Sequence, residues 1–205
     1  MNNGFFSAPK PVNEPVLKYK KNSPERKEVL KKYKELYNSN IAVPLYIGSK
    51  KIITNIRTKM APPHDHKHTL GSFSMAEAFH VTKAIDAALT ASPNWECTSF
   101  ENRAAVFLKA ADLIAGPYRA KINAATMLAQ SKNIFQAEID AACEFADFLR
   151  FNVAFASDIY AQQPIQGNGV INRLEYRPLE GFVYAVTPFN SVSYTHLTLP
   201  TTVFV

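Results

Sequence analysis

The sequence predicts an α/β protein in which helices precede the start of a parallel sheet. Residues 183–186 form a short, wholly apolar run, typical of a strand buried on both faces of such a sheet. Thr187 and Pro188 end this run, because proline cannot donate to a strand ladder and restricts the residue before it. Four segments from Ser74 onward carry apolar residues at helical spacing. Asn190 then lies just past the predicted strand, where open α/β sheets bind their ligands.

The first 22 residues form the first predicted unit. They are rich in proline and lysine, and we expect an extended arm. Ser23 is a good helix N-cap, and Pro24 suits the first helical position. The pattern therefore predicts a helix from Ser23 to about Tyr37.

A group of short strands is predicted next. Residues 41–47 and 51–56 are rich in β-branched and apolar side chains and flank Gly48-Ser49-Lys50, which indicates a hairpin. Residues 70–73 predict one more short strand. No internal repeat is visible in this region or elsewhere.

Two capping boxes predict the starts of the next helices. Residues 74–77 (Ser-Met-Ala-Glu) and 98–101 (Thr-Ser-Phe-Glu) each place a hydroxyl three residues before a glutamate, followed by apolar residues at helical spacing. Gly116 and Pro117 are expected to close the second of these helices and open a third.

The last predicted elements are a long helix and two strands. Asn133 and Gln136 are expected to cap a helix that reaches about Ala161. Residues 171–176 alternate apolar and polar side chains, which predicts a half-solvated antiparallel strand. The apolar run at 183–186 follows.

Charge is distributed unevenly along the 205 residues. The net charge is +6, and residues 1–68 carry fourteen Lys or Arg against five Asp or Glu, whereas the remainder carries nine against twelve. A basic N-terminal third could bind nucleic acid or another partner as a non-catalytic helical module. No nucleic-acid-binding signature accompanies it, so a solvated helix face is the preferred interpretation.

The two cysteines and the apolar pattern limit the classes of protein to which this chain can belong. Cys97 and Cys143 imply no disulfide framework, and we expect both to be packing residues. A carboxylate next to Cys143 is expected to raise its pKa. No apolar run approaches the roughly 20 residues that span a bilayer. The N-terminal residues suit neither a signal nor a transit peptide, so we expect a cytoplasmic protein without membrane contact, the mitochondrial matrix being the alternative.

Three alternating histidines, His64, His66 and His68, are candidate metal ligands. Alternate residues of a strand share one face and could bind zinc. Pro62 and Pro63 before them indicate a turn instead, and a fourth ligand is not evident. We therefore expect a hairpin turn and no metal site.

Several motifs resemble those of the aldehyde dehydrogenase superfamily, and within it the L-glutamate γ-semialdehyde (Δ1-pyrroline-5-carboxylate) dehydrogenases. The motifs extend over residues 1–190, about a third of a full-length member. They are Asn-Glu-Pro-Val-Leu at 13–17, Ser-Pro-Glu-Arg at 23–26, Phe-Leu-Lys-Ala-Ala-Asp at 107–112, the run from Gln136 to Asn152, and the run from Arg177 to Asn190.

The resemblance implies the fold and its division into parts. The chain would be the N-terminal part of an aldehyde dehydrogenase fold, with an incomplete Rossmann-like NAD-binding domain and an oligomerisation hairpin. The expected parts are an arm (1–22), the helical and hairpin part of the NAD-binding domain (23–164), the oligomerisation hairpin (165–179), the first strand of the dinucleotide-binding sheet (180–190) and a tail foreign to the family (191–205).

The resemblance also implies roles for individual residues. Asn190 matches the asparagine that stabilises the oxyanion formed when a cysteine thiolate attacks the aldehyde. Glu144 matches a glutamate at the mouth of the aldehyde site, although an exposed helical acid would look the same in sequence. Val186, Thr187, Pro188 and Phe189 match the segment that lies against the nicotinamide end of NAD.

The implied reaction is the NAD-dependent oxidation of L-glutamate γ-semialdehyde to glutamate in proline breakdown, carried out by a homo-oligomer. The family's nucleophile and general base lie beyond position 190, so residues 1–205 are expected to be inactive by themselves.

Overall fold

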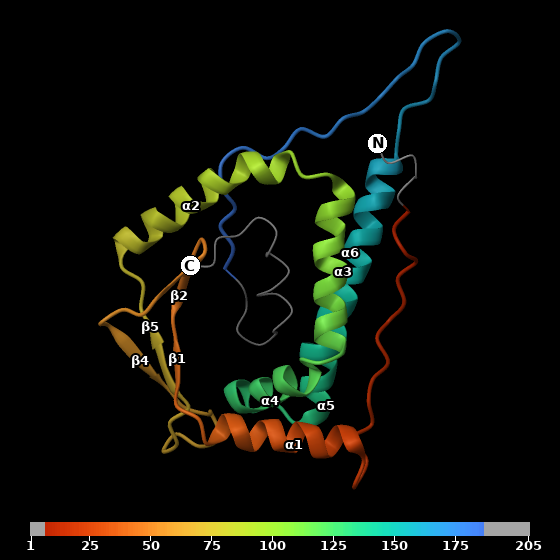
Figure 1. The fold of residues 1–205 in the computed structure, drawn as a ribbon. Coiled ribbons are helices and arrows are strands. Elements are labelled where there is room, and N and C mark those ends of the chain that lie inside the picture. Colours follow the sequence, from red (N-terminus) through yellow and green to blue (C-terminus); the bar gives the residue numbers. More distant parts are fainter. Residues whose placement is uncertain (1–6, 187–205) are drawn as a thin grey trace.

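The structure, a computed structural model, describes residues 7–186 of the chain. Within this range it combines helices with short strands, in agreement with the predicted α/β class (Figure 1). In chain order the elements are α1 (Pro24–Tyr37), β1 (Ile41–Val43), β2 (Leu45–Ile47), β3 (Lys50–Ile52), β4 (Arg57–Met60), β5 (Gly71–Ser74), α2 (Ala78–Glu96), α3 (Phe100–Ala115), α4 (Arg119–Gln130), α5 (Ile134–Ala137), the π-helix η1 (Glu138–Cys143) and α6 (Glu144–Ala161).

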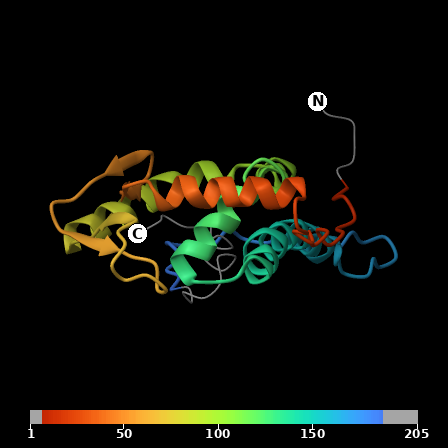
Figure 2. The same cartoon turned by 90° about the horizontal axis from the view of Figure 1, so that it is seen from below.

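Helix α1 begins as its sequence predicts. Ser23 is the N-cap and accepts a hydrogen bond from the backbone N–H of Arg26, and Pro24 occupies the first turn. The helix packs against α4, where Val29 is buried with Ala120 (Figure 2). This contact joins the N-terminal part of the chain to the helical part.

The strands form two small sheets rather than one hairpin. The predicted hairpin exists only as the antiparallel pair β2–β3. Pro44 separates β2 from β1, and β1 instead pairs in parallel with β5, whose other neighbour is the unpredicted strand β4. The pairing requires Gly71, because a Cβ there would lie 1.9 Å from the carbonyl oxygen of Ile41.

Both predicted capping boxes at 74–77 and 98–101 are wrong in position. Ser74 ends β5, and its Oγ accepts from the backbone N–H of Thr54. The capping box of α2 is formed instead by Glu77 and His80, and Ser99 rather than its neighbour caps α3. Tertiary pairing of β5 therefore outweighs the local capping signal.

The third and fourth predicted helices follow the sequence more closely. Gly116 ends α3 as expected, although α4 begins at Arg119 rather than at Pro117. Asn133 and Gln136 form the predicted capping box. The long segment that follows contains η1, which no sequence pattern indicated.

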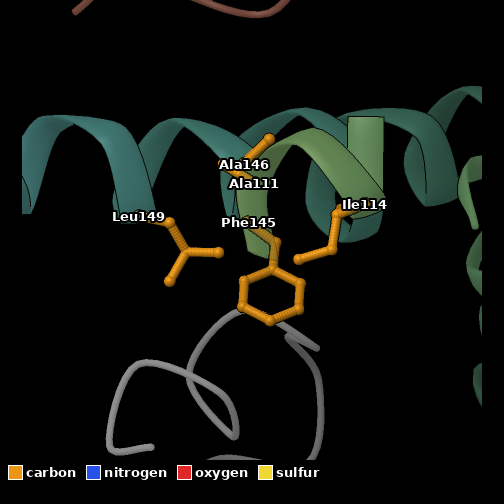
Figure 3. Packing of buried hydrophobic residues seen from close by; sticks show 5 residues of the cluster. All are labelled: Ala111, Ile114, Phe145, Ala146 and Leu149. Carbon is orange, nitrogen blue, oxygen red and sulfur yellow. The ribbon is translucent and has the colours of Figure 1, made fainter. Parts of the chain in front are cut away.

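The main hydrophobic cluster lies between α3 and α6. Figure 3 shows Ala111 and Ala146 where the helices meet, with Ile114, Phe145 and Leu149 extending to one side. The two alanines allow the helices to approach closely. This packing fixes the direction of α6, whose first residue is the candidate Glu144.

Two predicted strands are absent from the described residues. Residues 171–176 make no strand ladder, and the amides of Gln163 and Gln166 instead bond the backbone of Leu174 and Asn172. Residues 183–186 form no strand either, and Val186 is 77% exposed rather than buried. A strand needs a neighbour to satisfy its backbone, and neither segment has one here.

Much apolar helix surface is left uncovered. Val106 on α3 and Phe155 on α6 are more than half exposed. Faces of this kind normally pack against another element.

Candidate functional site

Glu144 is the predicted site residue that the structure describes best. It is half-buried at the start of α6, directly after η1. Burial raises the pKa of its carboxyl group, and the negative charge of Asp140 raises it further, while Lys132 acts in the opposite direction. Lys132 Nζ lies 2.5 Å from Asp140 Oδ2, so a cation–carboxylate pair adjoins the candidate.

A buried polar cluster lies beside the base of this helix. Glu138, in the first turn of η1, has no exposed surface. Its Oε1 accepts from the backbone N–H of Leu17 at 2.8 Å and from Arg119 Nη2 at 2.5 Å. Its Oε2 accepts from the hydroxyl of Tyr19 at 2.7 Å and from Asn123 Nδ2 at 2.7 Å. Both oxygens of a fully buried carboxylate are thereby satisfied.

A second carboxylate extends this cluster to α6. Glu14 accepts from Arg119 Nη1 and Arg150 Nη1, each at 2.6 Å, through different oxygens. Arg119 Nη2 also donates to the carbonyl oxygen of Pro15 at 2.7 Å. The N-terminal arm is thus bound through Glu14 to Arg119 of α4 and to Arg150 of α6.

The charges in this cluster hold each other ionised. Burial by itself raises the pKa of Glu138, but hydrogen bonds from Arg119, Leu17, Tyr19 and Asn123 bring the pKa below its usual value. Burial likewise raises the pKa of Glu14, but hydrogen bonds and charges from Arg150 and Arg119 bring this pKa below its usual value. The pKa of Tyr19 is raised by burial and by Glu138, so Tyr19 remains a hydrogen-bond donor.

Sequence patterns did not reveal this cluster. Arg119 and Asn123 lie four residues apart on a helix face that also buries Ala120 and Ala124. Two polar residues on an otherwise apolar face are the only signal, and it does not identify Glu138 as their partner.

The two cysteines differ from each other. Cys143 is buried as expected, and burial, with the charge of Glu138 second, raises its pKa to about 12. The predicted direction is confirmed, although the main carboxylate is Glu138 rather than Glu144. Cys97 is exposed at the C-cap of α2, so its predicted packing role is wrong. A thiol with a pKa near 12 is not a nucleophile at neutral pH.

This difference predicts selective thiol labelling of the native chain. An aromatic disulfide reagent at neutral pH is expected to modify Cys97 and to spare Cys143 until the chain is unfolded in denaturant. Cys97→Ser should therefore remove labelling of the native chain. Equal modification of Cys143 with and without denaturant would show that the arm and helices do not cover it.

The three histidines lie in a turn, as predicted. His64 contacts the hydroxyls of Tyr33 and Ser131, at 3.3 and 2.8 Å. His68 lies 2.6 Å from the carbonyl oxygen of Tyr37 and stacks on its ring. Over residues 7–186, no three His, Cys, Asp or Glu side chains form a group that could hold a metal ion.

The remaining predicted site residues lie at the C-terminal side. Asn190, Thr187, Pro188 and Phe189 fall outside the described residues. Val186 is described, and its side chain is exposed. Of the predicted site residues, the structure therefore describes Glu144 and Val186.

Glu144 does not line the cavity of about 890 Å³ that lies beside the β2–β3 hairpin. This cavity is also bordered by α2, the start of α3, the end of α6 and residues 176–183. Tyr160 lines it from the far end of α6, sixteen residues from Glu144 and about 24 Å along the helix axis. A further cavity, of about 470 Å³, lies beside the arm and is lined by Arg150 and Asp112.

The basic N-terminal third forms an exposed surface. Lys20, Lys21 and Arg26 are exposed, while Lys32 pairs with Glu35 on the same helix. This agrees with a solvated helix face. None of the helices in residues 7–186 combines the length and apolar character needed to cross a membrane.

Comparisons with known proteins agree with the geometry. A family model described as the aldehyde dehydrogenase family matches residues 54–198, so the match runs past Asn190, where we expected the resemblance to end. A Schizosaccharomyces pombe protein named probable delta-1-pyrroline-5-carboxylate dehydrogenase is 49% identical over 187 residues, which are 90% of this chain and 34% of that protein. The human mitochondrial delta-1-pyrroline-5-carboxylate dehydrogenase is 43% identical over 184 residues, 90% of this chain and 33% of that protein.

Solved structures show the same arrangement. The Delta-pyrroline-5-carboxylate dehydrogenase from Mycobacterium tuberculosis bound with NAD matches with a TM-score of 0.94 and 46% identity, over 97% of this chain and 37% of that one. The chain therefore spans about a third of the length of the relatives it matches. These relatives are dehydrogenases, so the comparisons do not favour a non-catalytic partner-binding module.

Proposed function

Because this chain belongs to the aldehyde dehydrogenase family, we propose that it is the N-terminal part of an NAD-dependent enzyme of proline catabolism. Its substrate is L-glutamate γ-semialdehyde, the open form of 1-pyrroline-5-carboxylate, and its product is L-glutamate. The observation that carries this proposal is the 49% identity to a relative named for that substrate. The proposed compartment is the cytoplasm, with the mitochondrial matrix as the alternative that the names of the human and mouse relatives favour.

The roles of this chain's residues follow from their chemistry. Asn190 would donate its side-chain amide to the aldehyde oxygen as it becomes an alkoxide, which lowers the barrier to thiolate attack. Glu144 would stand at the substrate entrance, where a carboxylate suits the ammonium group of an amino-acid semialdehyde. Neither Cys97 nor Cys143 supplies the thiolate, because Cys143 is buried with a high pKa and the resemblance places the nucleophile beyond position 190.

The C-terminal segment fits one end of the cofactor. Val186 offers an exposed apolar side chain, which suits contact with a flat nicotinamide ring. With Thr187, Pro188 and Phe189 it would hold that end of NAD. When bound, NAD supplies the acceptor for the hydride. The chain's contribution is to orient the ring and to exclude water from it.

A full-length chimera tests this function. Residues 1–190 of this chain would precede the remainder of the Schizosaccharomyces pombe relative, and NADH formation would be followed with the semialdehyde. We expect turnover by the chimera. A chimera that folds and binds NAD, yet oxidises simple aldehydes and not the semialdehyde, would refute the substrate assignment.

We further propose that the full-length protein is a homo-oligomer joined through residues 165–179. This segment projects from the end of α6 as a long loop (Figure 1). Ile165 and Ile171 within it are 92% and 86% exposed, which favours burial against a second copy.

Charge placed on this loop is expected to weaken the oligomer. Ile165→Lys combined with Ile171→Lys in the chimera should shift sedimentation toward smaller species, because buried lysines would lack partners. Val12→Lys, at an apolar residue of the arm that is 71% exposed, is the control. Unchanged sedimentation of the double variant would exclude this segment as the interface.

A further inference from the structure

The N-terminal arm binds the Glu144 helix on both sides of Glu144. On the N-terminal side, Glu138 accepts from the backbone N–H of Leu17 and the hydroxyl of Tyr19. On the C-terminal side, Asp147 accepts from the backbone N–H of Glu14 at 2.6 Å and from Asn13 Nδ2 at 2.8 Å. The arm thus holds positions six residues before and three residues after Glu144.

The arm and helix lie side by side in space. Figures 1 and 2 both show the arm running beside the start of α6 before the chain turns into α1. The turn is built from Tyr19 and Asn22, whose φ angles of 46° and 68° are left-handed. Left-handed backbone is unfavourable for a bulky residue such as tyrosine, so surrounding contacts must maintain it. The hydroxyl bond from Tyr19 to buried Glu138 is one of them.

The held segment includes the only π-helix of the described residues, η1. A π-turn inserts backbone between α-helical turns and changes the direction in which the following side chains point. Glu144 is the first residue after it. The direction of Glu144 therefore depends on a helical form that is less stable than an α-helix and that begins at Glu138.

We propose that residues 13–19, here named the strap, position Glu144 by clamping its helix at Glu138 and Asp147. This inference rests on the proposed role of Glu144 in holding the semialdehyde. Glu138, Asp147 and the strap are positioning groups, because their contacts are with each other and with neighbouring residues of the helical part. The strap thereby maintains the π-turn that directs Glu144 toward the substrate.

The test compares two substrates in the full-length chimera. L-Glutamate γ-semialdehyde carries the ammonium and carboxylate groups that Glu144 can recognise, whereas propanal carries neither. We expect Glu144→Gln to raise the KM for the semialdehyde about tenfold, the scale of one lost charge-assisted hydrogen bond, and to leave the KM for propanal within about twofold. Asn13→Ala, which removes a bond to Asp147, and Glu138→Gln should do the same.

Combining a strap substitution with Glu144→Gln distinguishes a strap that positions Glu144 from one that only stabilises the fold. If the strap acts through Glu144, a strap substitution added to Glu144→Gln should raise the KM little further. Lys18→Ala, an exposed residue of the same strap, is the matched control and should resemble the parent. Asn13→Ala removes only an exposed side-chain bond, so it keeps the test valid if Glu138→Gln does not fold.

Three outcomes contradict the proposal, and they are distinguishable. Strap variants that leave the semialdehyde KM unchanged, while Glu144→Gln raises it, overturn the strap alone. Strap variants that lower kcat equally for both substrates show a structural role only. Glu144→Gln without effect on the semialdehyde overturns the role of Glu144, and the positioning proposal with it.

Discussion

Replacing Asn190 by alanine in the full-length chimera is expected to lower kcat by about 10²–10³, with little change in NAD affinity. This is the usual cost of removing one donor from an oxyanion site. The amide matters most in the transition state, because the aldehyde oxygen carries full negative charge only after the thiolate has attacked. A loss confined to kcat and kcat/KM would identify an interaction made in the transition state.

The measurement is steady-state kinetics with the semialdehyde, combined with NAD binding by fluorescence. Asn55→Ala, which changes an exposed asparagine between β3 and β4, is the matched control. The competing role for Asn190 is a helix N-cap, whose loss costs about 0.5–2 kcal/mol of stability. A near-normal kcat with a lower melting temperature would support the cap and reject the oxyanion role.

Replacing Arg119 by methionine is expected to destabilise the 205-residue chain by about 3–5 kcal/mol at neutral pH, the usual cost of breaking one partner of a buried ion pair. Arg119 bonds Glu138, Glu14 and the carbonyl oxygen of Pro15. Without it, Glu138 keeps its charge in a site with no exposed surface. Because domain stabilities are only 5–15 kcal/mol, complete unfolding of the variant would also agree with this expectation.

The stability lost in Arg119→Met should depend on pH in a definite direction. The pKa values of Glu138 and Glu14 are lowered in the folded chain. Their contribution to stability is therefore present above the unfolded value near 4.5 and is lost as the pH falls through the lower folded values. The difference between the parent and Arg119→Met should be largest at neutral pH and should narrow in acid.

Urea unfolding followed by circular dichroism at several pH values checks both statements. Lys32→Met breaks the exposed pair with Glu35 and should cost no more than about 1 kcal/mol. Equal losses for Arg119→Met and Lys32→Met would show that the cluster is solvated. A loss that grows in acid would show that the carboxylates are not held ionised by Arg119.

Local sequence was sufficient where a helix start depends on its own residues. Ser23 with Pro24, and Asn133 with Gln136, cap helices where predicted, because a cap bonds only to backbone within one turn. Local sequence gave the wrong helix start at Ser74, because the Ser74 hydroxyl instead accepts a hydrogen bond from the backbone N–H of Thr54. The apolar run at 183–186 forms no ladder in the described residues, since a strand exists only with a neighbour.

The candidate site also has one part that the sequence indicated and another that only the tertiary structure shows. Motifs alone indicated a dehydrogenase, because a family resemblance depends on residue types and their spacing; they also proposed Glu144 as a site residue. Glu138 reads in sequence as one more helical acid, and only the tertiary structure buries it against Arg119 and Tyr19. The reason is distance along the chain: its partners at Leu17 and Tyr19 lie more than a hundred residues away, and no local pattern records a contact made by folding.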